Sequence, residues 1–172
     1  MKNYILHLKE TIKALFSTKN KQIIFLDFDG VLCPINDEID DGKDKFGQLF
    51  NAECVKQFNS IIAATDAKIV ITSSWRQYLS LWQLRRMWRK RNMSGKIVGR
   101  TPQLQNNRGN EIDKWLTNNR VHNYVILDDM DFRQFNEHHK SHLVTCNGRV
   151  GLTADDARRV INILYNDQFH TL

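Results

Sequence analysis

The feature that most constrains this 172-residue chain is a short apolar segment that ends in two acidic side chains. Residues 23–26 are Ile-Ile-Phe-Leu, and they are followed by Asp27, Phe28, Asp29 and Gly30. The run is too short for a helix, and its bulky residues favour a buried strand. Open α/β sheets bind ligands at the carboxyl ends of their strands, so this segment predicts a site as well as a strand.

Asp27 and Asp29 are two carboxylates separated by a single aromatic residue. Carboxylates this close repel each other unless a cation lies between them, and magnesium is the usual cation in such sites. Beside a metal ion, one carboxylate can attack phosphorus while the other transfers protons. Because Asp27 comes first after the strand, we expect it to be the nucleophile and Asp29 to be the acid and base. Val31 and Leu32 stand where a calcium-binding loop would need further oxygen ligands, which disfavours calcium.

The rest of the chain alternates between expected strands and expected helices. Short apolar runs predict strands at residues 68–72, 97–98, 124–127 and 143–145. Apolar residues at helical spacing predict helices over residues 55–62, 81–88, 111–116 and 153–164, the last one capped by Thr153. This alternation predicts an α/β protein with a three-layer, Rossmann-like fold around a parallel sheet of about five strands. A loop of only about 20 residues follows Asp29, so we expect a minimal cap domain or none.

The N-terminal residues have the pattern of an amphipathic helix. Residues 4–16 carry apolar side chains at helical spacing, so we expect residues 1–20 to form a helix packed on a domain that spans residues 21–172. A role on a membrane surface or on a partner is the alternative, although the polar face is only modestly basic. Charged residues interrupt any signal-peptide core, and no apolar run approaches the roughly 20 residues of a membrane span. We therefore expect a cytoplasmic protein with no membrane partner, and the three scattered cysteines indicate neither disulfides nor a zinc site.

Three of the expected strands end in oxygen-bearing side chains. These are Asp27 and Asp29 after the first strand, Thr72 and Ser73 after the second, and Asp128 and Asp129 after the fourth. Parallel strands place such ends on one edge of the sheet, so we expect these side chains to converge. Asp27, Asp29 and one of Asp128 or Asp129 would supply oxygen ligands to Mg²⁺. Thr72, or Ser73 beside it, would donate a hydrogen bond to the transferring phosphoryl group.

A phosphate site also needs a cationic side chain. Arg108 stands just before the helix expected at residues 111–116 and can neutralise phosphate charge, with Lys114 as the alternative. Trp75 and Arg76 follow the second strand directly, where they would stack on or grip a substrate, although Trp75 could equally close the core beneath the site. The residues expected to line the substrate are therefore Gly30, Ser74, Trp75, Arg76 and Lys114.

Basic residues concentrate between Arg76 and Arg108 in a chain whose net charge is +6. Residues 85–91 are the most basic segment, and a polyanion such as nucleic acid would fit it. A helix with one buried stripe around Trp88 and a solvated cationic face fits the same residues equally well. Both interpretations remain open on the sequence alone.

A patch of histidines stands at His138, His139 and His142. His138 and His142 have the i,i+4 spacing of a helical metal-binding pair. No third ligand of fitting type stands nearby in the sequence, so we interpret the patch as a polar surface turn.

These motif residues resemble those of the haloacid dehalogenase-like (HAD) superfamily of phosphohydrolases. Residues 27–31 are similar to its first motif, in which the leading Asp is phosphorylated and the second Asp is the acid and base. Residues 69–72 resemble the second motif, Arg108 lies where the third has Lys or Arg, and residues 127–129 resemble the acidic fourth motif that helps hold magnesium. The likeness extends over about residues 22–165.

A closer resemblance is to small HAD-like domains that carry a Ser-Ser-Trp-Arg signature after the second strand. In this chain the signature is residues 73–76, and it is followed by similar segments at residues 99–102, 108–112 and 151–153. This resemblance implies a link with RNA repair systems.

Together these features predict a magnesium-dependent phosphatase that acts through an aspartyl-phosphate intermediate. The substrate is expected to be a large phosphate ester, with RNA or DNA ends as candidates, because a site without a cap is open. The alternative from another class is a nucleic-acid-binding module that keeps the fold and has no turnover. A phosphotransferase, in which an acceptor alcohol replaces water, is a third option. A binding module would not require both Asp27 and Asp29, which favours an enzyme.

Overall fold

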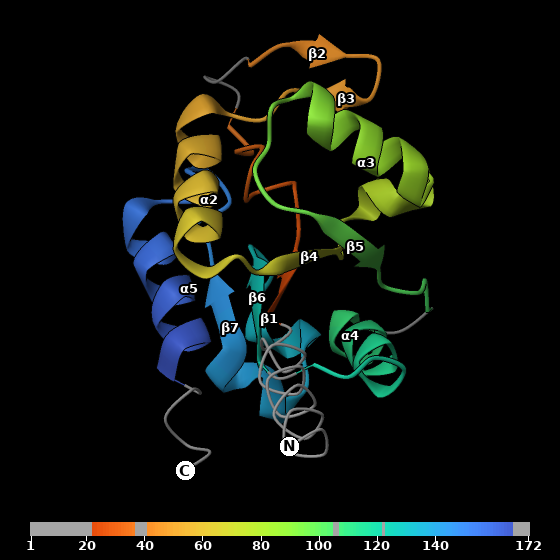
Figure 1. The fold of residues 1–172 in the computed structure, drawn as a ribbon, viewed down its shortest axis with the longest axis vertical. Coiled ribbons are helices and arrows are strands. Elements are labelled where there is room, and N and C mark those ends of the chain that lie inside the picture. Colours follow the sequence, from red (N-terminus) through yellow and green to blue (C-terminus); the bar gives the residue numbers. More distant parts are fainter. Residues whose placement is uncertain (1–21, 37–40, 105–106, 122, 167–172) are drawn as a thin grey trace, which may run out of the picture.

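A five-stranded sheet forms the centre of the molecule (Figure 1). The computed structural model describes residues 22–36, 41–104, 107–121 and 123–166. Its strands are β1 (Gln22–Leu26), β4 (Lys68–Ile71), β5 (Ile97–Arg100), β6 (Asn123–Asp128) and β7 (Leu143–Thr145), in the order β5-β4-β1-β6-β7. All the strands expected from the sequence are confirmed, and every pairing between them is parallel. The helix expected at residues 4–16 lies outside the described residues.

Helices cover both faces of this sheet and complete a three-layer α/β fold. They are α2 (Ala52–Thr65), α3 (Leu81–Lys90), α4 (Arg108–Thr117) and α5 (Ala154–Asn166). One hydrophobic cluster joins α2, α3 and α5 to one face of the sheet, and a second cluster joins α4 to the other face. The Rossmann-like architecture predicted from the sequence is therefore confirmed. Within the described part of the chain, no helix has the length and apolar character needed to cross a membrane.

The side chains of β1 alternate between the two clusters, which explains why this strand is central. Ile24 and Leu26 pack with α2, α3 and α5, whereas Ile23 and Phe25 pack on the side of α4. A strand covered on both faces favours apolar residues at successive positions, and residues 23–26 have this pattern. Phe25 also meets the ring of Trp115 in α4 edge-on, with ring centroids 5.4 Å apart.

Side-chain caps fix the first residues of α4 and α5. The Asn107 side chain accepts a hydrogen bond from the backbone N–H of Asn110 at 3.0 Å, which places Arg108 at the first position of α4. The Thr153 hydroxyl accepts from the backbone N–H of Asp156 at 3.2 Å, so the cap predicted for the last helix is confirmed.

A small hairpin takes the place that a cap domain would occupy between β1 and α2. It consists of β2 (Lys43–Asp44) and β3 (Gly47–Gln48), within the loop of about 20 residues expected after Asp29. Asp44 accepts a hydrogen bond from the Arg91 guanidinium at 2.9 Å, which ties the hairpin to the end of α3. Gly47 lies against the indole of Trp75, where a Cβ atom would come within 3.1 Å of the ring. In Figure 1 the hairpin lies above α3.

Candidate functional site

The carboxyl ends of β1, β4 and β6 lie side by side at one edge of the sheet. Leu26 of β1 is in register with Ile71 of β4 and with Leu127 of β6, so the residues that follow are level with one another. The backbone N–H of Asp27 donates to the Leu127 carbonyl at 3.0 Å, and that of Thr72 donates to the Leu26 carbonyl at 2.9 Å. The register of a parallel sheet therefore brings the polar ends of three separate segments together.

Three carboxylates converge at this edge. Asp27, Asp128 and Asp129 each offer an oxygen atom, and these oxygens all lie within 4.8 Å of one another. Asp128 is fully buried and Asp27 nearly so, while Asp129 is partly exposed. A set of hard oxygen donors that is buried on one side and open on the other fits Mg²⁺, which keeps several waters or substrate oxygens in its shell.

Two carboxylates of the acidic site, Asp128 and Asp129, have raised pKa values. Burial and the neighbouring Asp27 carboxylate raise the pKa of Asp128 to about 7, and the same two causes raise the pKa of Asp129. A bound divalent cation would act in the opposite direction, because positive charge favours ionised carboxylates.

Arg108 contributes positive charge to the same place. Its Nη1 atom donates hydrogen bonds to Asp27 and to Asp128. Burial acts to lower the pKa of Arg108, but the Asp128 and Asp27 carboxylates outweigh burial and raise this pKa above its ordinary value. Lys114, the alternative expected from the sequence, is exposed and lies six residues further along α4. Of the two, Arg108 is the one that contacts the acidic residues.

Asp29 is held by the residues that follow β4. The indole Nε1 of Trp75 lies 3.1 Å from each carboxylate oxygen of Asp29, and the Ser74 hydroxyl lies 3.4 Å from one of them. Burial raises the pKa of Asp29, and the Trp75 hydrogen bond acts in the opposite direction. Trp75 also meets Phe28 edge-on, with ring centroids 5.4 Å apart. Trp75 therefore does two things at once: it packs on the core and it orients Asp29.

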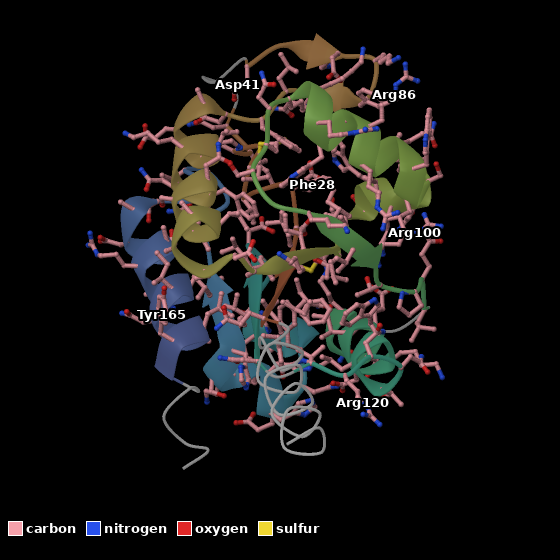
Figure 2. The ribbon with its side chains drawn as sticks, viewed as in Figure 1. Phe28, Asp41, Arg86, Arg100, Arg120 and Tyr165 are labelled. Atoms are coloured by element: carbon pink, nitrogen blue, oxygen red, sulfur yellow. The ribbon has the colours of Figure 1, made fainter. Side chains whose placement is uncertain are left out.

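Phe28 separates the two acidic side chains of the first motif and anchors them. It is fully buried and contacts the rings of Phe50, Trp75 and Trp88. Figure 2 shows Phe28 in the interior of the molecule, between α2 and α3. Because neighbouring residues in an extended chain point to opposite sides, burying Phe28 turns Asp27 and Asp29 away from the core.

Two glycines make room for Asp129. Gly30 has a φ of +69°, and a Cβ atom there would lie 2.2 Å from Asp129 Oδ2. A Cβ atom on Gly148 would lie 2.7 Å from the same oxygen. Gly30 was expected to line the substrate, and the structure places it against Asp129. The role of Gly148 was not predicted, because the sequence gives no sign of how close these segments come.

Buried hydroxyl groups surround the ends of β4 and β5. Thr72 and Ser73 are fully buried, and the Ser73 hydroxyl accepts a hydrogen bond from the Trp75 backbone N–H at 3.4 Å. The hydroxyls of Thr72 and of Thr101, which follows β5, are buried and have no hydrogen-bond partner among the described residues. Buried hydroxyls are normally paired, so these two have hydrogen-bonding capacity that the described residues leave unused. Thr101 was not singled out in the sequence.

Arg76 lies beneath the site and does not extend from it. It is buried, and its guanidinium forms an ion pair with Glu111 of α4 and donates to the Ser73 carbonyl at 2.8 Å. The Glu111 carboxylate also accepts from the backbone N–H of Leu104 at 3.0 Å. Arg76 was expected to grip a substrate, whereas these contacts use it to fasten the turn after β4 to α4. The partner, Glu111, stands 35 residues away in the chain and was not predicted.

Comparison with known families agrees with this arrangement. The family model of the HAD domain in Swiss Army Knife RNA repair proteins matches residues 23–157. The chain belongs to this family. The match includes the carboxyl ends of β1, β4 and β6 and the whole of α4, so the HAD resemblance drawn from the sequence motifs is confirmed. No curated protein matches the chain.

Proposed function

We propose that this HAD domain is a magnesium-dependent phosphohydrolase that forms an aspartyl-phosphate and acts on phosphorylated nucleic-acid ends. The observation that carries the proposal is the convergence of Asp27, Asp128 and Asp129 beside Arg108. HAD-family membership supports phosphohydrolase chemistry in general, and the family description supports a role in RNA repair.

Asp27, Asp128 and Asp129 are the residues that would hold the magnesium ion. When bound, magnesium supplies positive charge that offsets the repulsion between a carboxylate nucleophile and an anionic phosphate ester. Asp29 lies in the same loop but is engaged by Trp75 and Ser74, which suits a proton-transfer role better than a direct ligand role.

The reaction divides between Asp27 and Asp29. A carboxylate oxygen of Asp27 attacks phosphorus, the ester P–O bond breaks, and the leaving oxygen takes a proton from Asp29. Water then attacks the phosphorylated Asp27 while Asp29 takes a proton from it. The bond between phosphorus and Asp27 breaks, inorganic phosphate leaves, and both side chains return to their starting states.

Three further residues would stabilise the phosphoryl group in this mechanism. The Arg108 guanidinium lies beside the nucleophile and has five N–H donors, of which those on Nη1 contact the acidic residues. The unpaired hydroxyl of Thr72 and the Ser73 hydroxyl stand at the end of the neighbouring strand. Donors that are fixed before the reaction begins stabilise developing charge without reorganisation.

The open edge of the sheet favours a large substrate. Between β1 and α2 the described residues form only a small hairpin, so there is no cap domain in that part of the chain to enclose a small molecule. The end of an RNA or DNA strand can approach such a site, and this agrees with the description of the family.

A phosphatase screen tests the proposal. Purified protein with Mg²⁺ should release phosphate from 5′- or 3′-phosphorylated oligonucleotides faster than from nucleotides, phosphopeptides or a generic aryl phosphate. Asp27→Asn should lower turnover by roughly three orders of magnitude or more with the fold intact, and the exposed control Asp155→Asn should leave it unchanged. Turnover near the wild-type rate in Asp27→Asn would exclude the mechanism.

A nucleic-acid-binding role without turnover is the second candidate function, and the surface of α3 favours it. Trp82 is 62% exposed, and the Arg86 guanidinium lies 5.3 Å from the centre of its ring. Figure 2 shows Arg86 at the periphery of the molecule. A groove of about 470 Å³ beside α3 is lined by Trp82, Arg85, Trp88, Arg89, Gly95, Lys96 and Ile97. Exposed aromatic rings among cationic side chains are what single-stranded nucleic acids bind.

Binding measurements separate the two candidates. Arg85 donates to the Ile97 carbonyl at 2.9 Å, so charge reversal is best confined to Arg86 and Arg89. If the domain only binds, Arg86→Glu with Arg89→Glu should abolish salt-dependent binding of single-stranded RNA, and no preparation should release phosphate. If it is an enzyme, Asp27→Asn should bind normally and lose turnover.

A further inference from the structure

A second cluster of metal-ligand side chains lies on α4, outside the acidic site. Asp113 of α4 meets His138 and His139 of the 3₁₀ helix η3 (Glu137–His142). The Nε2 atoms of His138 and His139 lie 2.8 and 2.9 Å from the same oxygen of Asp113, Oδ1. All three ligand atoms lie within 4.8 Å of one another.

We propose that Asp113, His138 and His139 form a binding site for a divalent transition metal, with zinc as the best-fitting ion. Two imidazole nitrogens and one carboxylate oxygen form a donor set that zinc uses, with the fourth position open to water. Zinc bound at about 2.0–2.1 Å in a tetrahedral site holds its ligands about 3.3 Å apart, so small side-chain rotations suffice to admit it. The His138 side chain is 58% exposed, and this gives the ion a path from solvent.

The cluster is already organised before any metal binds. The second oxygen of Asp113 accepts a hydrogen bond from Asn136 Nδ2 at 2.6 Å, and Asn136 is itself held by Asn110 at 3.1 Å. His139 is fully buried and meets the ring of Tyr124 edge-on. Outer partners of this kind orient ligands and strengthen metal binding. Burial also disfavours the charged form of an imidazole, and the neutral form is the one that binds metals.

This ligand set differs from the pair His138 and His142, whose spacing in the sequence is that of a helical metal-binding pair. His142, which has helical spacing from His138, stacks on Tyr124 with ring centroids 4.2 Å apart, and its Nδ1 lies 2.9 Å from the Tyr124 carbonyl. The third ligand comes from α4, 25 residues before His138 in the chain. The interpretation of the patch as a plain surface turn missed Asp113 because sequence distance conceals the contact.

The chemistry of the two clusters separates their metals. The acidic site offers carboxylate oxygens, which suit magnesium, whereas imidazole nitrogens favour divalent transition metals such as zinc, copper and nickel. A metal at Asp113 would also join α4 to the segment after β6. These two parts of the chain already lie close together. A Cβ atom on Gly109 would lie 2.7 Å from the backbone nitrogen of Asn136.

Metal titration of the untagged, full-length protein tests the proposal. With saturating Mg²⁺ present to occupy the acidic site, the metal-free protein is titrated with Co²⁺ and then with Zn²⁺. One equivalent of Co²⁺ should produce visible d–d absorption of a four- or five-coordinate site, and Zn²⁺ should displace it. At a hundredfold excess over its Kd, Zn²⁺ should raise the Tm by roughly 5–10 °C.

Variants at the cluster decide whether the ion binds there. His138→Ala and Asp113→Asn should each lose the absorption and the Tm shift, and their Tm values in chelator will show that they remain folded. His142→Gln and Glu137→Gln should keep both signals, because neither residue belongs to the proposed ligand set. The proposal is overturned if no Co²⁺ binds, or if His138→Ala and Asp113→Asn bind it as well as the wild type. The outcome does not depend on phosphatase activity.

Discussion

The indole nitrogen of Trp75 lies 3.1 Å from both carboxylate oxygens of Asp29. The donor comes from the turn after β4 and the acceptor from the loop after β1, so one hydrogen-bonded pair joins two of the segments that build the site. Because the Trp75 ring also packs on Phe28, the position of the Asp29 carboxylate is coupled to the core.

Trp75→Phe separates the hydrogen bond from the packing. The phenyl ring can keep the contact with Phe28, but Asp29 loses its N–H donor. We expect kcat on an aryl phosphate to fall roughly tenfold, because a hydrogen bond to a charged group is worth about 1.5–3 kcal/mol. Steady-state kinetics measure kcat, and circular dichroism shows whether the variant is folded. Trp82→Phe, at an exposed position on α3, is the control and should keep the wild-type kcat; equal losses in both variants would contradict the assigned role.

Gly30→Ala should abolish magnesium-dependent activity, because the new Cβ atom would collide with Asp129 Oδ2 at 2.2 Å. Gly42→Ala is a matched control: its φ is +78°, similar to that of Gly30, but among the described residues its Cβ atom would meet only Leu49, at 3.8 Å. Both variants should lose about 1 kcal/mol of unfolding free energy from the left-handed backbone. Only Gly30→Ala should weaken Mg²⁺ binding, measured by calorimetric titration; equal affinities would show that Asp129 is not a ligand.

Arg108→Ala leaves Asp27 and Asp128 buried without their cationic partner. Removing one member of a buried ion pair costs about 3–5 kcal/mol, so we expect the unfolding free energy in chelator to fall by that amount. Added Mg²⁺ should restore part of the loss, because the ion supplies the missing positive charge. Lys114→Ala is exposed and should have an effect within about 0.5 kcal/mol. Urea denaturation with and without Mg²⁺ gives both values, and identical losses in the two conditions would argue against a metal between these acids.

The hairpin carries a pH-dependent contact. The Arg91 hydrogen bond holds the pKa of Asp44 below its ordinary value of 3.8. Since the folded-state pKa is the lower one, the stability from this pair is present above pH 3.8 and is lost as the pH falls through the folded-state pKa. Asp44→Asn should therefore lower the urea midpoint at neutral pH and match the wild type at strongly acidic pH. Asp155→Asn, in an exposed pair with Arg158, should change little at either pH; a pH-independent difference for Asp44→Asn would refute the assignment.

Local sequence patterns predicted the sheet well because parallel strands impose a regular geometry. The apolar run before Asp27 is buried on both faces, and register alone places Thr72 and Asp128 next to it. No further information was needed to predict that the strand ends would converge.

Local sequence patterns could not predict contacts between side chains that are far apart in the chain. The sequence left open whether Trp75 packs or contacts the site, and it does both because the ring spans from the core to Asp29. The sequence predicted that Arg76 contacts the substrate, whereas its guanidinium is buried in an ion pair with Glu111 on α4. Charged side chains are usually exposed, so only the three-dimensional arrangement shows which of them are buried in pairs.

The central place of β1 also bears on how the protein comes to be active. Its two neighbours in the sheet, β4 and β6, are made later, one after α2 and the other after α4, and each contributes polar side chains to the edge where Asp27 lies. A chain still emerging from the ribosome therefore holds Asp27, the nucleophile of the proposed mechanism, long before Asp128 and Asp129. The proposed phosphate chemistry would therefore require that β6 has been synthesised and docked, because an unfinished copy of the protein would lack two of the three acidic side chains of the site.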